Sequence, residues 1–363
     1  MRCDAGPRFV RLSCSSSVRH PPLAAWHVDA PHQVAQLGDL LLENGEVIED
    51  FRQSFVTHGT LDSTRSNAVL ICSAITGNHH RLDFLIGPGK ALDPQRWFVI
   101  ATDAIGNGLS TSPSNSVRQP RMRFPSFNVR DMVTAQHRLL TRHLGIERLA
   151  AVVGASMGGM QALQWAVSHP RTMDAIVAMT PLARTPAWSR AVNETTRLCL
   201  MADPAWNGQE FTSPPTRGWQ AWLNVQRVLV SRTPHALAEQ FPNPADLHGW
   251  TETLRRQWLV DGFDAHDFIY QSRAYDMHDV GATPGFHGVA SALASIVAQA
   301  LILTPPLDLY NPVEDARLAA ASIRGATHRE IPSKQGHQSA SGTTPDDVAF
   351  LNRVIGAFLD SGR

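Results

Sequence analysis

The segment of this chain with the clearest chemical meaning is Gly154–Gly159, whose sequence GASMGG fits the pattern G-x-S-x-G. The apolar run Leu149–Val153 precedes it, and a helical pattern over Gly158–Ser168 follows it. Between a strand and a helix, this pattern forms a sharp turn that lifts the serine hydroxyl above the sheet. We expect glycine at both ends of the motif because a side chain there would collide with the neighbouring strand or helix. The sequence therefore predicts Ser156 as a nucleophile for acyl transfer.

A serine hydroxyl needs a base and a carboxylate that orients the base, and after such a turn the chain order is serine, acid, histidine. Among the 16 histidines we predict His337 as the base, because it precedes the C-terminal helical pattern in a loop at the ligand-binding edge of the expected sheet. We predict Asp308 as the acid, since it follows the apolar run Ala300–Leu303. Glu314 and Asp315 are alternatives, but both lie within a helical pattern.

Negative charge develops on the carbonyl oxygen when a serine attacks it, and two backbone N–H groups stabilise that charge. One comes from the residue after the nucleophile, Met157, and the other from the loop after the first core strand, here residues 73–77. Within that loop we assign Ile75, with Ala74 as the alternative. His79 follows the loop and is a candidate substrate-binding residue at the pocket mouth; the other interpretation is an exposed loop histidine.

Short apolar runs alternate with helical patterns through most of the chain, which is typical of a parallel sheet covered by helices on both faces. Two further apolar segments flank Asn44-Gly45 and predict an antiparallel hairpin within residues 36–60, since this dipeptide favours a type I′ turn. We therefore predict an α/β fold with a mostly parallel sheet. The expected core strands are 68–72, 97–101, 149–153, 175–179 and 300–303, and the expected helices are 129–144, 158–168 and 345–359.

A long segment interrupts this alternation between the fourth and fifth core strands. Residues 183–290 contain many helical patterns and six of the nine tryptophans of the chain. An insertion of about a hundred residues with helices of its own is unusual for a loop and indicates a cap domain. We therefore predict an α/β core built from residues 35–182 and 291–363, a helical cap over 183–290, and a loose lead-in over 1–34.

The composition of the 363-residue chain argues against several classes of protein. Lys plus Arg and Asp plus Glu are both 32, so the net charge is zero and we expect no nucleic-acid partner. The uncharged run Gly288–Leu307 contains polar side chains and two prolines, so we expect no membrane insertion. The four cysteines have no C-x-x-C spacing, and the N-terminus lacks the apolar stretch of a secretory signal. These features predict a cytoplasmic protein with reduced thiols.

Two patterns of acidic residues and histidine, Asp264–Asp267 and Asp276–Asp279, resemble metal-binding segments. Zinc sites favour closed His/Cys sets or the His-Glu-x-x-His arrangement, and neither occurs here. We interpret both patterns as helix-end capping. The sequence therefore predicts no metal site and no bound cofactor.

These motifs together resemble the homoserine O-acetyltransferase family of the α/β-hydrolase fold over residues 36–360. The segment 154–165, GASMGGMQALQW, is the most specific match, and Ser73–Gly77 resembles the His-Ala-Leu-Thr-Gly of that family. The resemblance implies an α/β-hydrolase fold with an inserted helical cap, a serine–aspartate–histidine triad and a homodimer. Further matching segments are Trp188–Arg197, Asp203–Gly208, Phe263–His266, Asp308 with Pro312, and Gly336-His337.

Three departures from the family pattern concern the substrate. The family's Gly-Gly-Cys-x-Gly-Ser-Thr-Gly-Pro is replaced by residues 104–113, AIGNGLSTSP. The family's cap arginine, with a tyrosine seven residues later, grips the homoserine carboxylate; between residues 218 and 236 this chain has Arg227 and Arg232 but no tyrosine. The family's aspartate after the catalytic histidine, which reads the amino group, is Gln338 here. Arg227 and Gln338 are thus candidate substrate-binding residues, and we expect homoserine to be a poor acceptor, because a buried charge needs a charged partner.

The predicted function is acyl transfer from a small-molecule ester or thioester through an acyl-enzyme, with hydrolysis as the main outcome. One alternative is an O-acyltransferase that moves an acetyl group from acetyl-CoA, the candidate acyl donor, to homoserine or another alcohol. A second alternative is a binding protein without catalysis on the same fold. Because the six tryptophans of the cap exceed what one thin helical layer buries, we also expect a homodimer through the cap.

Overall fold

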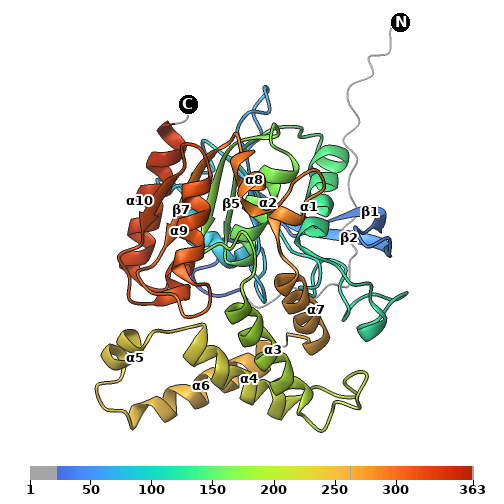
Figure 1. Cartoon of the computed structure of the whole chain (residues 1–363), viewed down its shortest axis with the longest axis vertical. Coiled ribbons are helices and arrows are strands. Elements are labelled where there is room, and N and C mark those ends of the chain that lie inside the picture. The colour runs from blue at the N-terminus through green and yellow to red at the C-terminus, as the bar shows by residue number, and fades with distance from the viewer. Residues whose placement is uncertain (1–22, 262, 362–363) are drawn as a thin grey trace, which may run out of the picture.

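The computed structural model of the chain describes residues 23–261 and 263–361 (Figure 1). Within this part, the side chains of residues 254, 255 and 257–261 lie outside the description. Most of the predicted lead-in, residues 1–22, also lies outside the described residues.

An eight-stranded sheet forms the centre of the molecule, with strand order β1-β2-β4-β3-β5-β6-β7-β8. The pairs β1–β2 and β2–β4 are antiparallel, and every other neighbouring pair is parallel. The carboxyl ends of the six parallel strands therefore meet at one edge of the sheet, which confirms the predicted architecture. The strands are β1 (Gln33–Leu41), β2 (Val47–His58), β3 (Ala68–Cys72), β4 (Phe98–Thr102), β5 (Leu149–Ala155), β6 (Met173–Met179), β7 (Gln299–Thr304) and β8 (Thr327–Glu330).

Two details of the strands differ from the sequence-based expectation. The β1–β2 hairpin forms as predicted, but its turn is not type I′, which needs positive φ at two central residues. Here Gly45 has φ of 86° and its N–H donates to the Leu42 carbonyl at 3.0 Å, whereas Asn44 keeps a negative φ. Strand β8 has the polar sequence THRE, and its residues are exposed or half-buried. An edge strand needs no continuous apolar run, so hydrophobicity gave no sign of it.

Helices cover both faces of the sheet, as predicted. Helices α1, α2, α8 and α9 pack on one face, and α10 with the short helix η1 packs on the other. No helix in the described part of the chain is both long and apolar enough to cross a bilayer. The helices are α1 (Val129–Arg138), α2 (Met157–Ser168), α3 (Ala187–Met201), α4 (Thr216–Leu229), α5 (Pro234–Gln240), α6 (Asp246–Asp261), α7 (Ala265–Asp276), α8 (Val289–Ala294), α9 (Val313–Ser322) and α10 (Pro345–Ser361), with short helices η1 (His79–Leu85), η2 (Arg121–Arg123), η3 (Leu139–Leu144), η4 (Val280–Ala282) and η5 (Gly336–Ser341).

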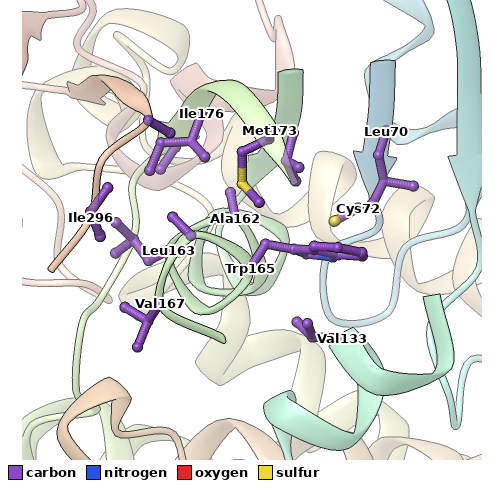
Figure 2. Packing of buried hydrophobic residues seen from close by; sticks show 14 of the residues in the cluster. Leu70, Cys72, Val133, Ala162, Leu163, Trp165, Val167, Met173, Ile176 and Ile296 are labelled. Atoms are coloured by element: carbon purple, nitrogen blue, oxygen red, sulfur yellow. The ribbon is translucent and has the colours of Figure 1, made fainter. Parts of the chain in front are cut away.

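Helix α2 supplies much of the packing on its face of the sheet (Figure 2). Its Leu163 and Trp165 are buried in one cluster with Leu70 of β3 and Ile176 of β6. The indole Nε1 of Trp165 donates a hydrogen bond of 2.7 Å to Gln136 of α1, so its polar atom is satisfied inside the core. Burial stabilises the fold by about 1.5–3 kcal/mol for each such apolar side chain. The start of α2, which carries the predicted nucleophile turn, is thereby held firmly against the sheet.

Helices α3–α7, between β6 and β7, form a helical layer beside the sheet, in which α3 and α7 lie nearer to the sheet than α4, α5 and α6 (Figure 1). Inside it, Trp219 and Trp222 contact Phe268 of α7 edge to face, with ring centroids 6.2 and 5.3 Å apart. Trp258 lies outside the described side chains. Helix α8, which falls within the range predicted for the cap, contacts α2 and α9 of the core instead. The division of the chain into a core and a cap stays a prediction.

Candidate active site

The turn that carries Ser156 connects β5 to α2 and has a strained backbone. Ser156 has φ of 56° and ψ of −123°, a conformation that residues other than glycine seldom adopt. The glycines around it are required by space: a Cβ on Gly154 would lie 2.1 Å from the carbonyl oxygen of Gly158, and one on Gly158 would lie 2.3 Å from that of Cys72. The strand–turn–helix context predicted for the motif is therefore present, and strain at a serine in such a turn is typical of a functional site.

The structure brings the three predicted residues together at the carboxyl edge of the sheet. The Oγ of Ser156 lies 2.8 Å from Nε2 of His337, and Nδ1 of His337 lies 2.7 Å from Oδ2 of Asp308. All three side chains are buried. The other carboxylate oxygen of Asp308 accepts hydrogen bonds of 2.8 and 2.9 Å from the backbone N–H groups of Tyr310 and Asn311. These bonds fix the carboxylate in the orientation that holds the imidazole.

The two alternative acids lie elsewhere. Glu314 and Asp315 occupy the first turn of α9, as the sequence pattern indicated. Glu314 is 3.8 Å from Arg317 of the same helix. The geometry therefore favours Asp308 as the partner of the histidine.

The loop after β3 lies beside the nucleophile. Ala74 and Ile75 line the same cavity as Ser156, and among the described residues no hydrogen bond uses the backbone N–H of either. The next residue, Thr76, has φ of 57° and donates its N–H to Gln271 of α7 at 3.1 Å. Met157 is the first residue of α2, where N–H groups have no partner within the helix. The N–H groups needed for an oxyanion hole are thus available, and the choice of Ile75 over Ala74 stays a prediction.

A cavity of about 280 Å³ opens over Ser156. This volume lies near the lower end of ligand pockets, about 300–1,000 Å³, and indicates a small substrate. The predicted substrate-binding residues Arg227 and Gln338 both line the cavity, and the described residues that line it include no carboxylate side chain. The apolar wall of the cavity comes mainly from the helical layer and consists of Trp222, Leu223, Val230, Trp250, Phe268 and Tyr310. Three arginines, Arg81, Arg227 and Arg232, also line the cavity.

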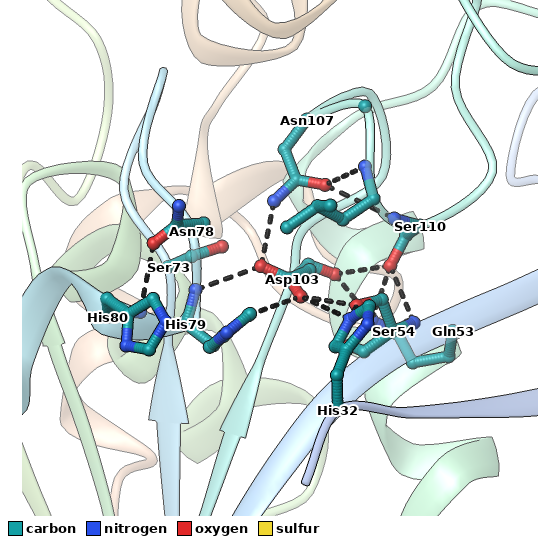
Figure 3. Close-up of polar contacts among 12 residues, drawn as sticks. His32, Gln53, Ser54, Ser73, Asn78, His79, His80, Asp103, Asn107 and Ser110 are labelled. Carbon is teal, nitrogen blue, oxygen red and sulfur yellow. Dashed lines mark hydrogen bonds and ion pairs between the residues drawn. The ribbon is translucent and has the colours of Figure 1, made fainter. Parts of the chain in front are cut away.

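His79, the third predicted substrate-binding residue, lies in a different place. His79 and the adjacent His80 are both buried, so the interpretation as exposed loop histidines is wrong, and His79 is not among the residues that line the cavity. Its Nδ1 lies 2.8 Å from Oδ2 of Asp103 and its backbone N–H donates to Oδ1 at 2.9 Å (Figure 3). Burial lowers the pKa of His79 and raises that of Asp103, but their mutual attraction outweighs burial, so the pKa of His79 is raised and that of Asp103 lowered.

The hydrogen bonds around Asp103 extend to the loop after β3. Besides its two bonds with His79, Asp103 accepts hydrogen bonds from Ser54 and Asn107. Asn107 in turn donates to the carbonyl of Gly77 at 3.2 Å, at the end of the predicted oxyanion loop. We therefore interpret His79 and Asp103 as residues that position this loop. Their pairing could not be predicted from sequence, because the two side chains meet only in the folded chain.

Among the described residues, one group has the composition of a metal site: the donor atoms of His32, His79 and Asp103 lie within 4.8 Å of one another. The carboxylate of Asp103 already accepts four hydrogen bonds, so it is satisfied by protein donors. Each of the two patterns considered in the sequence contains one capping residue. Asp264 caps α7 and Asp279 caps η4 through bonds to backbone N–H groups.

Two residues of the site escaped the sequence analysis. The ring of Tyr310 contacts that of His337 edge to face at 5.1 Å, and its hydroxyl donates to Asn193 of α3 at 2.6 Å. Its position two residues after the predicted acid is a signal that could have indicated it. Arg81 lines the cavity from η1, and no local pattern distinguishes it from a surface arginine.

Comparisons with known proteins show the fold and the family of this chain. A family model for the α/β hydrolase fold matches residues 67–215. The homoserine O-acetyltransferase of Caulobacter vibrioides is 34% identical over 340 residues, which are 83% of this chain and 87% of that protein. That of Mesorhizobium japonicum is 32% identical over 355 residues, 88% of this chain and 90% of that protein.

Solved structures of two kinds of enzyme are similar to this one. An acetylester hydrolase from Corynebacterium glutamicum has a TM-score of 0.84 at 28% identity, with 91% of this chain and 96% of that chain covered. Homoserine O-acetyltransferase from Bacillus anthracis has a TM-score of 0.82 at 25% identity, with 91% and 98% covered. With this identity and coverage, the chain belongs to the homoserine O-acetyltransferase family of enzymes on the α/β-hydrolase fold.

Proposed function

We propose that this enzyme transfers acyl groups through an acyl-enzyme on Ser156 and mainly hydrolyses small esters or thioesters. The contact of Ser156 with His337, and of His337 with Asp308, is the observation that carries the proposal. In this mechanism the serine oxygen attacks the carbonyl carbon of the substrate while Nε2 of the histidine takes the hydroxyl proton. The N–H groups of Met157 and Ile75 stabilise the negative oxygen that forms.

The second half of the reaction decides between a hydrolase and a transferase. The protonated His337 gives its proton to the leaving alcohol or thiol, and the acyl group stays on Ser156 as an ester. A water molecule or an acceptor alcohol then loses a proton to the histidine and attacks that ester. Water is our preferred acceptor, because the described lining of the cavity provides no carboxylate for the ammonium group of an amino-acid acceptor. The acetylester hydrolase among the similar structures also supports hydrolysis.

A panel of acyl donors tests this proposal. The enzyme would be incubated with short esters and with acetyl-CoA, each with and without alcohols, and the products identified by mass spectrometry. We expect the free acid as the main product. An alcohol ester formed in preference to the acid would show that the enzyme is a transferase, with acetyl-CoA as the candidate donor.

Homoserine is expected to stimulate thiol release from acetyl-CoA by less than about twofold. When a charged group of a substrate is buried without its partner, kcat/KM for that substrate falls by roughly two or more orders of magnitude. Arg227 lines the cavity and is available to bind the carboxylate of homoserine, but Gln338 is neutral and leaves the ammonium group of homoserine without a charged partner. The measurement is thiol release with and without homoserine, with product analysis. A strong homoserine-dependent rate that yields O-acetylhomoserine would show that other groups have replaced the lost residues.

A homodimer through the helical layer is the assembly we propose. Trp188 and Leu198 of α3 and Val228 of α4 are large apolar side chains that are 49%, 57% and 56% exposed on this layer. Burying such side chains against a second copy would remove apolar area from water. Light scattering is expected to give twice the chain mass of 39.8 kDa. The single-chain mass at all concentrations would contradict the proposed dimer. The cytoplasmic location of the enzyme also stays a prediction.

A further inference from the structure

A positively charged side chain without a partner lies in the wall of the cavity over Ser156. Arg81 lines this cavity, and its Nε is buried without a hydrogen-bond partner. Among residues 23–261 and 263–361, no carboxylate forms an ion pair with it and no hydrogen bond from its side chain is found. Buried charges in proteins are ordinarily paired or hydrogen-bonded, so an unpaired guanidinium in a cavity next to a nucleophile calls for a ligand.

The charge on Arg81 persists at neutral pH. Burial lowers the pKa of Arg81 to about 10, which still leaves the guanidinium protonated near pH 7. In the part of the chain that the structure describes, the other two arginines of the cavity also lack carboxylate partners. Arg227 donates to Thr251 and Asn224, and Arg232 donates to the carbonyl of Ser231 at 2.7 Å. The described residues that line the cavity therefore provide no carboxylate to neutralise its positive charge.

Arg81 differs from these two arginines in how it is held. Arg227 and Arg232 both contact the ring of Trp250, at 5.6 and 5.7 Å, so the helical layer already engages them. Arg81 comes from η1, in the core after the predicted oxyanion loop, and its guanidinium has no such contact among the described residues.

The backbone at Arg81 is fixed by buried contacts of its neighbours. His79 is tied to Asp103 at 2.8 Å, and Nδ1 of His80 lies 2.6 Å from Oδ2 of Asp83 (Figure 3 shows the two histidines). The N–H of Arg81 itself donates to the carbonyl of Asn78 at 3.0 Å. A cation on such a rigid segment loses little entropy when it binds an anion, which is the condition for a specific contact.

We propose that Arg81 binds a negatively charged group of the substrate, so that the preferred substrates are esters or thioesters that carry a carboxylate or a phosphate. This inference rests on the proposed acyl transfer and adds the charge class of its substrate. A guanidinium binds both anions through paired N–H groups. The shared chemistry is therefore an anion in the same cavity as the acyl carbon that Ser156 attacks. The anion could belong to the acyl part, to the alcohol part, or to the phosphates of coenzyme A.

Three matched pairs of substrates distinguish these sources. The first pair is 4-nitrophenyl hemisuccinate against 4-nitrophenyl pentanoate, with the charge on the acyl side. The second is 3-acetoxybenzoate against 3-methylphenyl acetate, with the charge on the alcohol side. The third is acetyl-CoA against S-acetyl-N-acetylcysteamine, with phosphates present or absent. We expect the native enzyme to prefer the charged member in at least one pair.

The variants Arg81→Gln and Arg81→Lys then test the residue. Arg81→Gln should lower kcat/KM for the preferred charged substrate by about tenfold or more, mainly through KM, and change the rate with its neutral partner by less than about twofold. Arg81→Lys should recover part of the loss because it restores the charge. Arg148→Gln is the matched control, since Arg148 is an exposed arginine paired with Asp174, and it should leave the ratio within each pair unchanged.

Two results would overturn the proposal. One is a native enzyme that treats the charged and neutral members alike in all three pairs. The other is an Arg81→Gln enzyme that loses activity equally on both members, which would assign Arg81 a structural role. Failure of the underlying function looks different, because then no ester, charged or neutral, would release its acyl group.

Discussion

Replacing Ser156 with alanine is expected to abolish acyl-enzyme formation and to lower kcat by about six orders of magnitude, as loss of the nucleophile does in serine enzymes. In the described structure, the hydroxyl of Ser156 contacts His337 at 2.8 Å and lines the cavity. The N–H of Ser156 donates to the carbonyl of Met179 at 2.9 Å, a backbone bond that alanine retains. The fold should therefore persist, with unfolding free energy changed by about 1 kcal/mol or less.

The control for this variant is a serine remote from the site. Ser361 is exposed at the end of α10, and its hydroxyl donates to the carbonyl of Phe358. Ser361→Ala should keep full turnover and the same melting curve. Full turnover by Ser156→Ala, on any ester that the native enzyme accepts, would refute the assignment of the nucleophile.

Replacing Asp308 with asparagine is expected to lower kcat by about four orders of magnitude, the loss seen when the acid of a serine protease triad is changed to its amide. The carboxylate accepts a hydrogen bond of 2.7 Å from the N–H at Nδ1 of His337 and thereby leaves Nε2 free to take the proton of Ser156. An amide NH₂ in that place favours the opposite tautomer of the imidazole. The other oxygen can still accept the N–H groups of Tyr310 and Asn311, so the loop should keep its shape.

Asp315→Asn is the matched control for the acid. Asp315 lies in the first turn of α9, and Nδ1 of His337 is hydrogen-bonded to Asp308 instead. Turnover by Asp315→Asn should stay within about twofold of the native rate, as for a surface change away from the site. A large loss in this variant together with a mild effect of Asp308→Asn would mean that the triad is assigned to the wrong acid.

The nucleophile turn could be predicted from sequence because its determinants are local. A strand, a serine between glycines and a helix lie within about twenty residues, and the close approach of Gly154 to Gly158 admits no side chain. Asp308 could be predicted for a related reason, since the end of an apolar run marks the carboxyl edge of the sheet. The base was placed by chain order and by the helix that follows it.

The parts that escaped prediction depend on contacts between distant segments. His79 and Asp103 follow the neighbouring strands β3 and β4 and pair at the carboxyl edge of the sheet, and the local sequence around a loop histidine does not identify such a partner. Arg81 lines the cavity because hydrogen bonds of the two preceding histidines fix the position of η1. These bonds require both Asp83 and Asp103. The choice between Ile75 and Ala74 is equally nonlocal, because it depends on how the loop after β3 meets the bound substrate.

The measurement that tests the central claim most directly is the mass of the enzyme quenched during turnover of a slow ester. Intact-protein mass spectrometry is expected to show a mass gain of one acyl group, and peptide mapping should place it on the segment that contains Ser156. The gain should be absent from Ser156→Ala and present in Ser361→Ala. Turnover of the ester with no acylated enzyme at any quench time, or with the acyl group on another residue that remains acylated in Ser156→Ala, would contradict the account.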